Sequence, residues 1–458
     1  MTEQQSIFLA KSEVKANDLE HKRKVSFNIQ KYNDSVVKGK KQFANLELAR
    51  QKAKNIKWKT IESLDKYLEQ FEKNFTANGG KLIWAENADE ALQAVLQICQ
   101  EKNTRQVVKA KSMVTEEIHL NDFLAEHGIE SVETDLGEYI QQLDGEPPYH
   151  IVTPAMHKSK EDVARVFHDK LGTEPNLSPS EITMIARRNL RQKYITAEVG
   201  ITGGNFLLAD IGGVCVSENE GNGRLSTSFP STHIAIVGIE KLIPSINDLP
   251  LFWPLLATFG TGQQITVYNS IFTGPRKANE TDGPEEMYVI LLDNGRTNLL
   301  RKEVRESMYC IRCGSCLNAC PVYKNIGGHA YGATYSGPIG AVITPHLSGM
   351  KEYKHLSYAS SLCGNCTEVC PVKINIHEML LENRSIAVEE NLNGFKEHAT
   401  WAVWERAMLS RRLLNIAGAG LKNKVVNTLF KDTWGKHRGE LHFAERSFNK
   451  MWRDRKKN

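Results

Sequence analysis

The chain contains Cys310-Ile311-Arg312-Cys313-Gly314-Ser315-Cys316-Leu317-Asn318-Ala319-Cys320-Pro321 and, further on, Cys363-Gly364-Asn365-Cys366-Thr367-Glu368-Val369-Cys370-Pro371. These two runs hold seven of its nine cysteines. The first run has the C-x2-C-x2-C-x3-C-P spacing of bacterial-type ferredoxins, in which three thiolates bind one [4Fe-4S] cluster and the fourth binds its neighbour. The proline restricts the backbone where the chain leaves the last ligand. The spacing therefore predicts iron–sulfur clusters and electron transfer.

Zinc and disulfide bonds are the alternative uses of clustered cysteines. A structural zinc ion takes four ligands, usually from two pairs that a long loop separates. The first run contains four closely spaced cysteines, three of them in tandem x2 spacing and the fourth before a proline. A zinc-binding pair would supply only two. Clustered thiols in a chain without a secretory segment favour metal over disulfides. Iron–sulfur binding is therefore the favoured interpretation.

The two-cluster rule predicts which cysteines share a cluster. The first cluster is expected to take four thiolates, namely Cys310, Cys313, Cys316 and Cys370. The second is expected to take three, namely Cys320, Cys363 and Cys366. The position for its fourth ligand, three residues before Cys363, is Ser360. The second centre is thus a [3Fe-4S] cluster, a [4Fe-4S] cluster with an oxygen or external ligand, or one completed from elsewhere. The spare Cys99 and Cys215 stand in apolar runs and are expected to be small buried hydrophobes.

Composition sets the broad class of the protein. The 458 residues suffice for two or three domains, and 41% hydrophobic and 24% charged residues are ordinary for a globular protein. No apolar run approaches the roughly 20 residues of a membrane helix, and the N-terminus lacks the features of a signal peptide. We therefore expect no transmembrane segment and a cytoplasmic location, with peripheral membrane association left open.

The positive charge is concentrated at the C-terminal end. Residues 396–458 contain 15 Lys and Arg against 6 Asp and Glu, whereas the net charge of the whole chain is only +4. A basic tail suits an acidic protein partner, an anionic membrane surface, nucleic acid or simply a solvated helical face. We expect no nucleic-acid partner, because the basic tail is the only feature that suggests one.

The N-terminal part of the chain predicts an α/β fold. Residues 1–75 are expected to be helical, because apolar residues recur there at steps of three and four, namely Ile61, Leu64, Tyr67, Leu68 and Phe71. In 76–300, strand-like segments alternate with helical ones. The strand-like segments are 82–85, 106–110, 129–134, 205–209, 213–217, 233–238, 264–268 and 287–292. This alternation predicts a parallel sheet. Thr115 is expected to cap the helix after 106–110, and Ser159 and Gly172 to bound a later helix.

The C-terminal part predicts a cluster domain and a tail. Residues 305–385 hold both cysteine runs and are expected to form an α-helical, two-cluster ferredoxin-like domain. Glycines between 327 and 340 predict a long irregular loop between the runs. His329 and His346 stand in this region, where loop structure or a hydrogen bond to a cluster sulfide is expected rather than ligation. Residues 395–458 are expected to be a basic, tryptophan-containing helical tail.

A second suggestive stretch runs from Gly200-Ile201-Thr202-Gly203-Gly204-Asn205 to Glu218-Asn219-Glu220-Gly221-Asn222-Gly223-Arg224. Its glycines match neither the dinucleotide G-x-G-x-x-G pattern nor a P-loop. Paired glycines near strand ends could let backbone amides approach an anion, with a polar pocket formed by Glu218, Glu220, Asn222 and Arg224. Tight turns with solvated side chains explain the stretch equally well.

This stretch, the cysteine runs and the tryptophan-containing tail together resemble the lactate utilization protein B family, over essentially the whole chain. The resemblance implies an N-terminal lactate-utilization domain, similar to the ribose-isomerase and CoA-transferase type of α/β fold, before the two-cluster domain. It also implies membership in a three-protein set that oxidises L-lactate to pyruvate and allows growth on lactate. By the same resemblance all seven clustered cysteines are ligands and both centres are [4Fe-4S], with Ser360 as the departure.

The leading hypothesis is therefore an electron-transfer subunit whose partners are the sister subunits of this lactate-oxidising system. No G-x-G-x-x-G follows a strand, so a Rossmann-bound flavin or NAD is not indicated, and the sequence names no electron acceptor. The alternative makes the α/β domain itself a small-molecule transferase or isomerase with regulatory clusters. Glu218 and Glu220 are the carboxylates that would then act.

Overall fold

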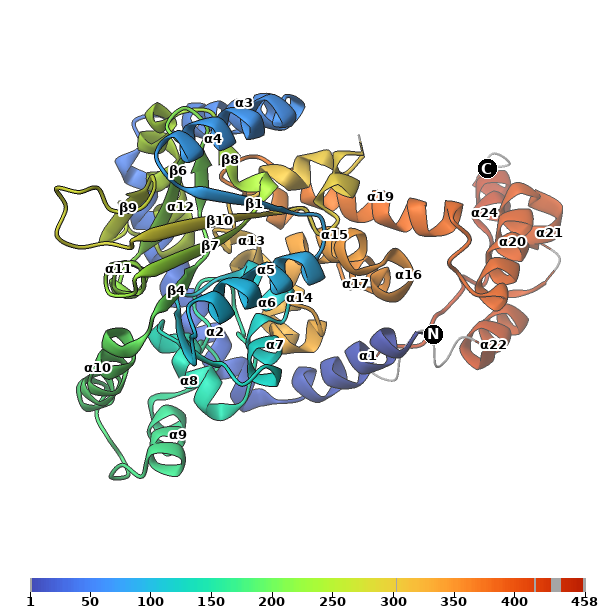
Figure 1. Ribbon diagram of the computed structural model, residues 1–458. Coiled ribbons are helices and arrows are strands. Elements are labelled where there is room, and N and C mark those ends of the chain that lie inside the picture. Colours follow the sequence, from blue (N-terminus) through green and yellow to red (C-terminus); the bar gives the residue numbers. More distant parts are fainter. Residues whose placement is uncertain (1, 302, 416, 430–437, 456–458) are drawn as a thin grey trace. The chain divides into compact units, whose positions relative to one another are not determined.

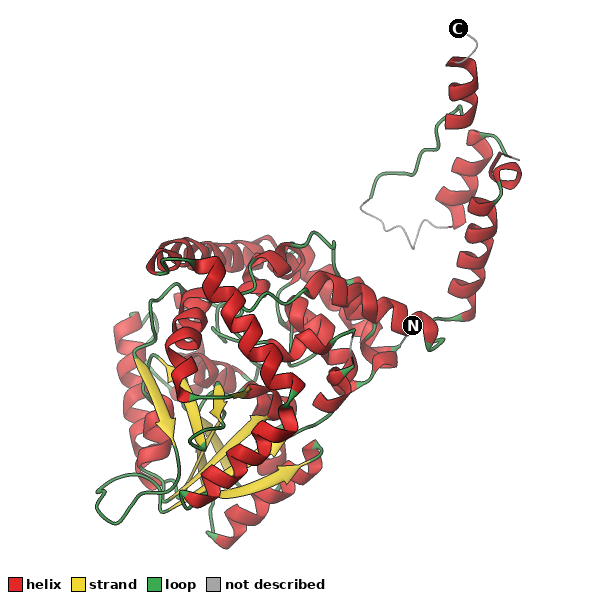
Figure 2. Ribbon diagram, turned by 90° about the horizontal axis from the view of Figure 1, so that it is seen from above, coloured by secondary structure: helices red, strands yellow, loops and turns green. Residues whose placement is uncertain are grey.

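The computed structural model describes residues 2–301, 303–415, 417–429 and 438–455. They form two compact units, 1–387 and 388–458. In the first unit, helices surround the strands (Figures 1 and 2). No helix within the described ranges is long and apolar enough to cross a membrane.

A six-stranded sheet is the centre of the first unit. Its strands are β1 (Lys81–Ala85), β2 (Gln106–Lys109), β3 (Glu130–Glu133), β4 (Val199–Thr202), β7 (Thr232–Gly238) and β10 (Glu286–Leu292). They lie in the order β1-β10-β7-β4-β2-β3, and all neighbours are parallel. Every residue of β4 and β7 is buried, as expected for strands covered on both faces. The predicted parallel α/β sheet is confirmed.

The strand order creates a switch point between β2 and β4. From β2 the chain continues to β3 at the sheet edge, and it then returns to β4 on the other side of β2. The connections that leave β2 and β4 therefore diverge in opposite directions. In open parallel sheets, ligands bind where such connections diverge, outside the carboxyl ends of the strands.

A smaller, four-stranded sheet shares a hydrophobic core with the first. Its strands are β5 (Phe206–Leu208), β6 (Gly213–Glu218), β8 (Leu242–Ile243) and β9 (Tyr268–Phe272), in the order β8-β5-β6-β9. The strand expected at 264–268 was misplaced, because β9 begins at Tyr268. The Thr266 hydroxyl donates to Asn269 Oδ1 (2.7 Å), and the Asn269 amide donates to the Thr266 carbonyl oxygen (3.0 Å), so a local turn precedes the strand.

Four helices form the N-terminal region, namely α1 (Glu3–Ala16), α2 (Leu19–Gly39), α3 (Leu46–Glu62) and α4 (Leu64–Ala77). The predicted apolar stripe is buried along α3 and α4. The helices among and beside the strands are α5 (Ala88–Glu101), α6 (Met113–Glu117), α7 (Leu120–Glu126), α8 (Leu136–Asp144), α9 (Lys160–Leu171), α10 (Pro179–Thr196), α11 (Asn222–Ser228) and α12 (Leu249–Thr261). Short 3-10 helices are η1 (Lys40–Gln42), η2 (Ile239–Lys241), η3 (Ile246–Asp248), η4 (Arg296–Leu300), η5 (Arg305–Tyr309) and η6 (His329–Tyr331).

Two predicted helix caps can be compared with the structure. Ser159 and Gly172 bound α9 as expected, and Ser159 forms a capping box with Asp162. Thr115 is not a cap, because α6 begins one turn earlier and the Ser112 hydroxyl accepts the Thr115 N–H at 3.4 Å. Serine is as good a cap as threonine, so the sequence alone could not separate the two positions.

The cysteine-containing region is mainly helical. Its helices are α13 (Ser315–Ala319), α14 (Pro321–Ile326), α15 (Gly337–Ser348), α16 (Met350–Tyr353), α17 (His355–Tyr358), α18 (Asn365–Glu368) and α19 (Ile376–Glu389). The prediction of a long irregular loop between the two cysteine runs is wrong from Gly337 onward, because α15 begins there. Gly340 serves close packing there, because a Cβ would collide with the carbonyl oxygen of Tyr335. Pro338 occupies the first turn of α15, where its missing N–H costs no hydrogen bond.

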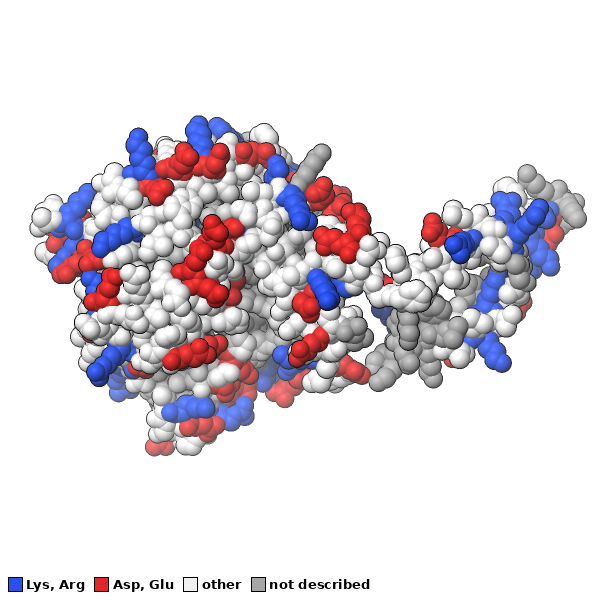
Figure 3. All heavy atoms as spheres, turned by 45° about the vertical axis from the view of Figure 1, so that its right-hand side comes forward, with Lys and Arg blue, Asp and Glu red and all other residues white. Residues whose placement is uncertain are grey.

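The second unit is helical, as predicted for the tail. Its helices are α20 (Phe395–Leu409), α21 (Arg411–Asn415), α22 (Ala419–Leu429) and α24 (Phe448–Arg455). It exposes large apolar side chains, among them Phe395 (86% exposed), Trp401 (57%) and Trp404 (53%). Basic side chains outnumber acidic ones on the face of this unit that is visible in Figure 3. Trp434 lies outside the described residues.

Candidate iron–sulfur site

The two cysteine runs repeat the same local backbone. Gly314 and Gly364 both have positive φ, 79° and 78°, and each forms the N-cap of a short helix, α13 or α18. Each helix carries the next cysteine of its run, Cys316 or Cys366, on its first turn. A left-handed residue costs little only as glycine, so the glycine after Cys313 and Cys363 is a requirement of this turn.

The repeat extends to the position where the cysteine pattern is broken. Arg312 and Leu362 both have positive φ, 58° and 52°. The N–H of Arg312 donates to Cys310 Sγ at 3.4 Å, and the N–H of Leu362 donates to Ser360 Oγ at 3.1 Å. Ser360 therefore occupies in the second run the place that Cys310 occupies in the first.

Four cysteines lie around one small cavity, namely Cys310, Cys313, Cys316 and Cys370. All four are buried, and the other walls are mostly apolar, with Arg312 as the charged residue. Burial raises the pKa of the Cys370 thiol to about 12, and it also raises the pKa of Cys313. Thiolates at these positions need a cation, so the residues present fit a bound metal cluster.

The other three cysteines lie together at a second place. The pKa of Cys366 is raised to about 11 by burial, then by the neighbouring charges of Cys320 and Cys363. Cys320 and Cys366 are buried, whereas Cys363 is exposed. The second group therefore reaches the surface, and the first does not.

A buried charge network lies beside the first group. Arg296 binds Glu117 at 2.7 Å and Glu240 at 2.6 Å, and Arg312 approaches Glu240 at 3.4 Å. The Tyr335 hydroxyl donates to Glu117 at 2.6 Å. Burial opposes ionisation of Glu240, but Arg296 and Arg312 outweigh it and hold its pKa well below the usual range. The network joins the ends of β7 and α6 to the first cysteine run.

We expect Arg296→Met to destabilise the protein by about 3–5 kcal/mol, because it leaves two buried carboxylates without their main counter-charge. Urea unfolding of anaerobically prepared protein measures the change. Lys193→Met is the control: it breaks the more exposed Lys193–Glu130 pair (2.7 Å) and should cost less than about 1 kcal/mol. If Arg296→Met costs as little stability as Lys193→Met, the buried network does not stabilise the protein.

The glycine- and glutamate-rich stretch is partly structural. A Cβ on Gly200 would collide with the Ser226 carbonyl oxygen, so this glycine lets α11 pack against β4. Glu218 accepts the backbone N–H groups of Gly223 (2.5 Å) and Arg224 (2.9 Å) at the start of α11. Glu220 accepts the Leu136 N–H at 3.1 Å.

The same stretch also contributes to a cavity. Glu218, Glu220 and Asn222 lie on its wall, together with residues that follow β2, β4 and β7. Arg224 does not line it: its guanidinium donates to the Ser270 hydroxyl at 3.4 Å. The two sequence interpretations of the stretch, turn and pocket, therefore both describe part of it.

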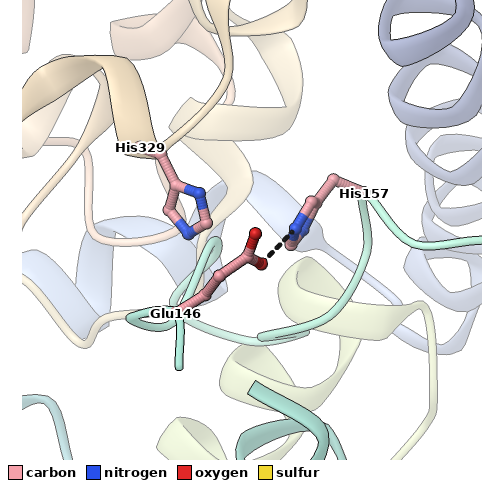
Figure 4. A group of neighbouring side chains, drawn as sticks. All are labelled: Glu146, His157 and His329. Atoms are coloured by element: carbon pink, nitrogen blue, oxygen red, sulfur yellow. Dashed lines mark hydrogen bonds and ion pairs between the residues drawn. The ribbon is translucent and has the colours of Figure 1, made fainter. Parts of the chain in front are cut away.

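The histidines of the cysteine-containing region make ordinary hydrogen bonds. His346 Nε2 pairs with Asn383 Oδ1, and His329 Nε2 with the Pro147 carbonyl oxygen, both at 2.8 Å. His329 lies near Glu146 and His157, which bond to each other at 3.1 Å (Figure 4). Lys158 already pairs with Glu146 at 2.9 Å, so we interpret this group as a structural network.

The spare thiols are buried, as predicted. Cys99 lies in α5 and Cys215 in β6, both in hydrophobic cores. Burial raises the pKa of each thiol to about 12, which makes both unreactive. Sequence reasoning missed the buried charges at Glu117, Glu240 and Arg296, because they come from distant segments and form no pattern along the chain.

Comparison with known proteins gives two family models and several relatives. The models are "LUD domain" over residues 68–292 and "4Fe-4S dicluster domain" over residues 306–374. "Lactate utilization protein B" of Bacillus licheniformis is 47% identical over 351 residues, 76% of this chain and 74% of the relative. The protein of that name from Geobacillus thermodenitrificans is 48% identical over 338 residues, covering 74% and 71%. "Uncharacterized electron transport protein YkgF" of Escherichia coli is 45% identical over 348 residues, covering 76% and 73%.

A crystal structure of a DUF162 family protein from Deinococcus radiodurans aligns with a TM-score of 0.30 at 14% identity, over 50% of this chain and 98% of that one. This likeness is too small to bear on the fold, and the resemblance to ribose isomerases and CoA transferases stays a prediction. The sequence relatives are 45–48% identical and cover about three quarters of this chain. The chain therefore belongs to the lactate utilization protein B family.

Proposed function

We propose that this protein is the iron–sulfur electron-transfer component of a multi-protein system that oxidises L-lactate to pyruvate. The observation that carries the proposal is a 4Fe-4S dicluster match in a chain whose relatives are named for lactate utilization. We also propose four sequence modules, 1–75, 76–300, 305–385 and 395–458, with the clusters in the third.

The proposed ligands are the seven clustered cysteines. Cys310, Cys313, Cys316 and Cys370 surround one cavity, which supports a [4Fe-4S] cluster held by these four. Cys320, Cys363 and Cys366 are proposed for the second. Such clusters, when bound, pass single electrons, so two of them can divide the electron pair that lactate releases. The chain's part is to hold the two groups side by side, one buried and one at the surface.

We propose that Ser360 Oγ is the fourth ligand of the second cluster. The support is the repeated backbone, in which Ser360 takes the place of Cys310 and accepts the equivalent N–H. A serine oxygen is a harder ligand than a thiolate, which distinguishes the second centre from the first.

The exposed Cys363 supports a direction for electron flow. The first group is enclosed and adjoins the cavity at the sheet edge, whereas the second group reaches solvent. A partner that takes electrons would then approach the second group.

The basic tail with its exposed tryptophans is the proposed docking element for a sister subunit, because aromatic residues and arginine are enriched at such interfaces.

The alternative, an α/β domain that is itself a transferase or isomerase, is not favoured. Both candidate carboxylates, Glu218 and Glu220, accept hydrogen bonds from backbone N–H groups, which is the role of helix caps rather than of free bases.

Anaerobic co-purification with the sister proteins tests the proposal. The protein should be brown, contain about seven to eight iron atoms per chain with matching acid-labile sulfide, and be reduced when L-lactate is added to the assembly. Absorbance and EPR spectra follow the reduction. Colourless, zinc-containing protein without sulfide would contradict it.

A further inference from the structure

A cavity of about 360 Å³ lies at the carboxyl edge of the six-stranded sheet. Lys111 and Ser112 follow β2, Gly203 follows β4, and Lys241 follows β7, and all four line it. It therefore opens at the β2/β4 switch point, where parallel sheets bind ligands. A Cβ on Gly203 would come within 2.6 Å of Ser112 Oγ, so this glycine allows the two strand ends to approach. The volume lies in the range of small-molecule sites.

The wall of this cavity contains a buried lysine, Lys241, that has no direct partner among the described residues. Lys241 is 7% exposed, and within the described part of the chain its ammonium makes no hydrogen bond or ion pair. The adjacent Glu240 is occupied by Arg296 and Arg312. Lys111, by contrast, donates to the Val152 carbonyl oxygen at 2.7 Å. Burial, then the charge of Arg312, lower the pKa of Lys241 to about 8, whereas Glu240 and Cys310 attract its ammonium from a distance. An enclosed ammonium without a direct hydrogen-bond or ion-pair partner favours an anion in the cavity that it lines.

The opposite charges on the wall limit what that anion can be. Asp135, Glu218 and Glu220 also line the cavity. Burial, and then the charge of Asp135, raise the pKa of Glu220 to about 7. Lys111, Lys241 and Arg312 line the cavity beside these three carboxylates, so the wall has no excess positive charge for a phosphate or pyrophosphate. A singly charged acid with a hydroxyl or keto group can place its carboxylate at Lys241. Carboxylate and amide oxygens elsewhere on the wall can accept a hydroxyl hydrogen.

The cavity also touches the cysteine site. Cys313 lines both this cavity and the smaller one among Cys310, Cys316 and Cys370. Arg312, the preceding residue, lines both as well, with its guanidinium over the Tyr335 ring at 4.5 Å from the centroid. A molecule in the larger cavity would therefore contact Cys313, a member of the first cysteine group.

We propose that this cavity binds a small 2-hydroxy or 2-oxo monocarboxylate, with Lys241 as the anchor of its carboxylate. The inference deepens the proposed function and rests on it, because it names where a substrate or product of the system would contact this chain.

The test is binding to the anaerobically purified, cluster-containing full chain, by calorimetry with pyruvate, L-lactate and uncharged L-lactamide. We expect Lys241→Gln to weaken pyruvate binding about tenfold to a hundredfold, the effect of losing one charge-assisted hydrogen bond. Lys241→Arg should keep affinity within about threefold. Arg224→Gln is the matched control, because it removes a positive charge near α11 without touching the cavity. Lys241→Gln should change the unfolding temperature little, since within the described residues the ammonium makes no hydrogen bond or ion pair.

The inference would be overturned by unchanged pyruvate affinity in Lys241→Gln, by equal affinity for L-lactate and L-lactamide, or by no binding of either acid to the native chain. A drop in unfolding temperature that accounts for weaker binding would also overturn it, by making Lys241 structural. A failure of the proposed function can be recognised independently of this site. If lactate does not reduce the assembly while Lys241-dependent binding persists, the site stands and the electron-transfer role does not.

Discussion

Cys313→Ser is expected to remove the first cluster and leave the second largely intact, whereas Cys363→Ser should do the reverse. Each variant should lose about half of the iron and sulfide of the native protein, because each takes a thiolate from only one proposed ligand set. The loss in Cys313→Ser should be the more complete, since this position is enclosed and no external thiol can replace the ligand. Cys363 is exposed, so added thiol should restore part of its cluster.

Iron and sulfide analysis, with EPR spectra of the reduced and oxidised proteins, measures these losses. Ser360→Cys is the companion variant: it should keep the iron content and convert the second centre to the spectrum of a four-thiolate [4Fe-4S] cluster. Ser360→Ala should produce a [3Fe-4S] signal. Equal loss of both clusters from either cysteine variant would contradict the ligand sets. An unchanged spectrum in both Ser360 variants would exclude this residue as a ligand.

Deletion of residues 396–458 is expected to abolish co-purification with the sister subunits and lactate-dependent reduction, with full cluster content retained. All seven clustered cysteines lie in the first compact unit, so the deletion removes none of them. The deleted segment carries the exposed Trp401 and Trp404, whose rings meet edge to face at 5.5 Å. The exposed Phe395 lies just before the deleted residues and is retained. Large aromatic side chains contribute most of the binding energy at many interfaces.

The double variant Trp401→Ala/Trp404→Ala separates docking from charge, because it leaves the basic residues in place. It should lose most of the co-purification, whereas binding to anionic vesicles that depends on Lys and Arg should persist. If the truncated protein still assembles and accepts electrons, the docking proposal is wrong. If the truncated protein loses only its binding to anionic vesicles and still co-purifies with its partners, the tail is instead a membrane-surface element.

Patterns along the chain predicted the elements that depend on near neighbours. Helix α9 appeared between Ser159 and Gly172, as predicted, because its caps are local. Strands β7 and β10 were close to their predicted bounds, because they are apolar runs of ordinary length. Helix α12 was not predicted, since Pro250 and Pro254 discourage a helix in the sequence. Its burial against the core outweighs that preference.

The sequence by itself determined the class of this protein, because cluster binding depends on cysteines a few residues apart, and short spacing is visible along the chain. It also placed Ser360 at the missing ligand position. Only the tertiary structure decided which residues surround the cysteines. Arg296, Glu117 and Glu240 meet only when η4, α6 and the end of β7 pack together. Lys241 likewise becomes an unpaired buried cation only when the strand ends and the first cysteine run close around it, because burial and pairing are properties of three-dimensional neighbours.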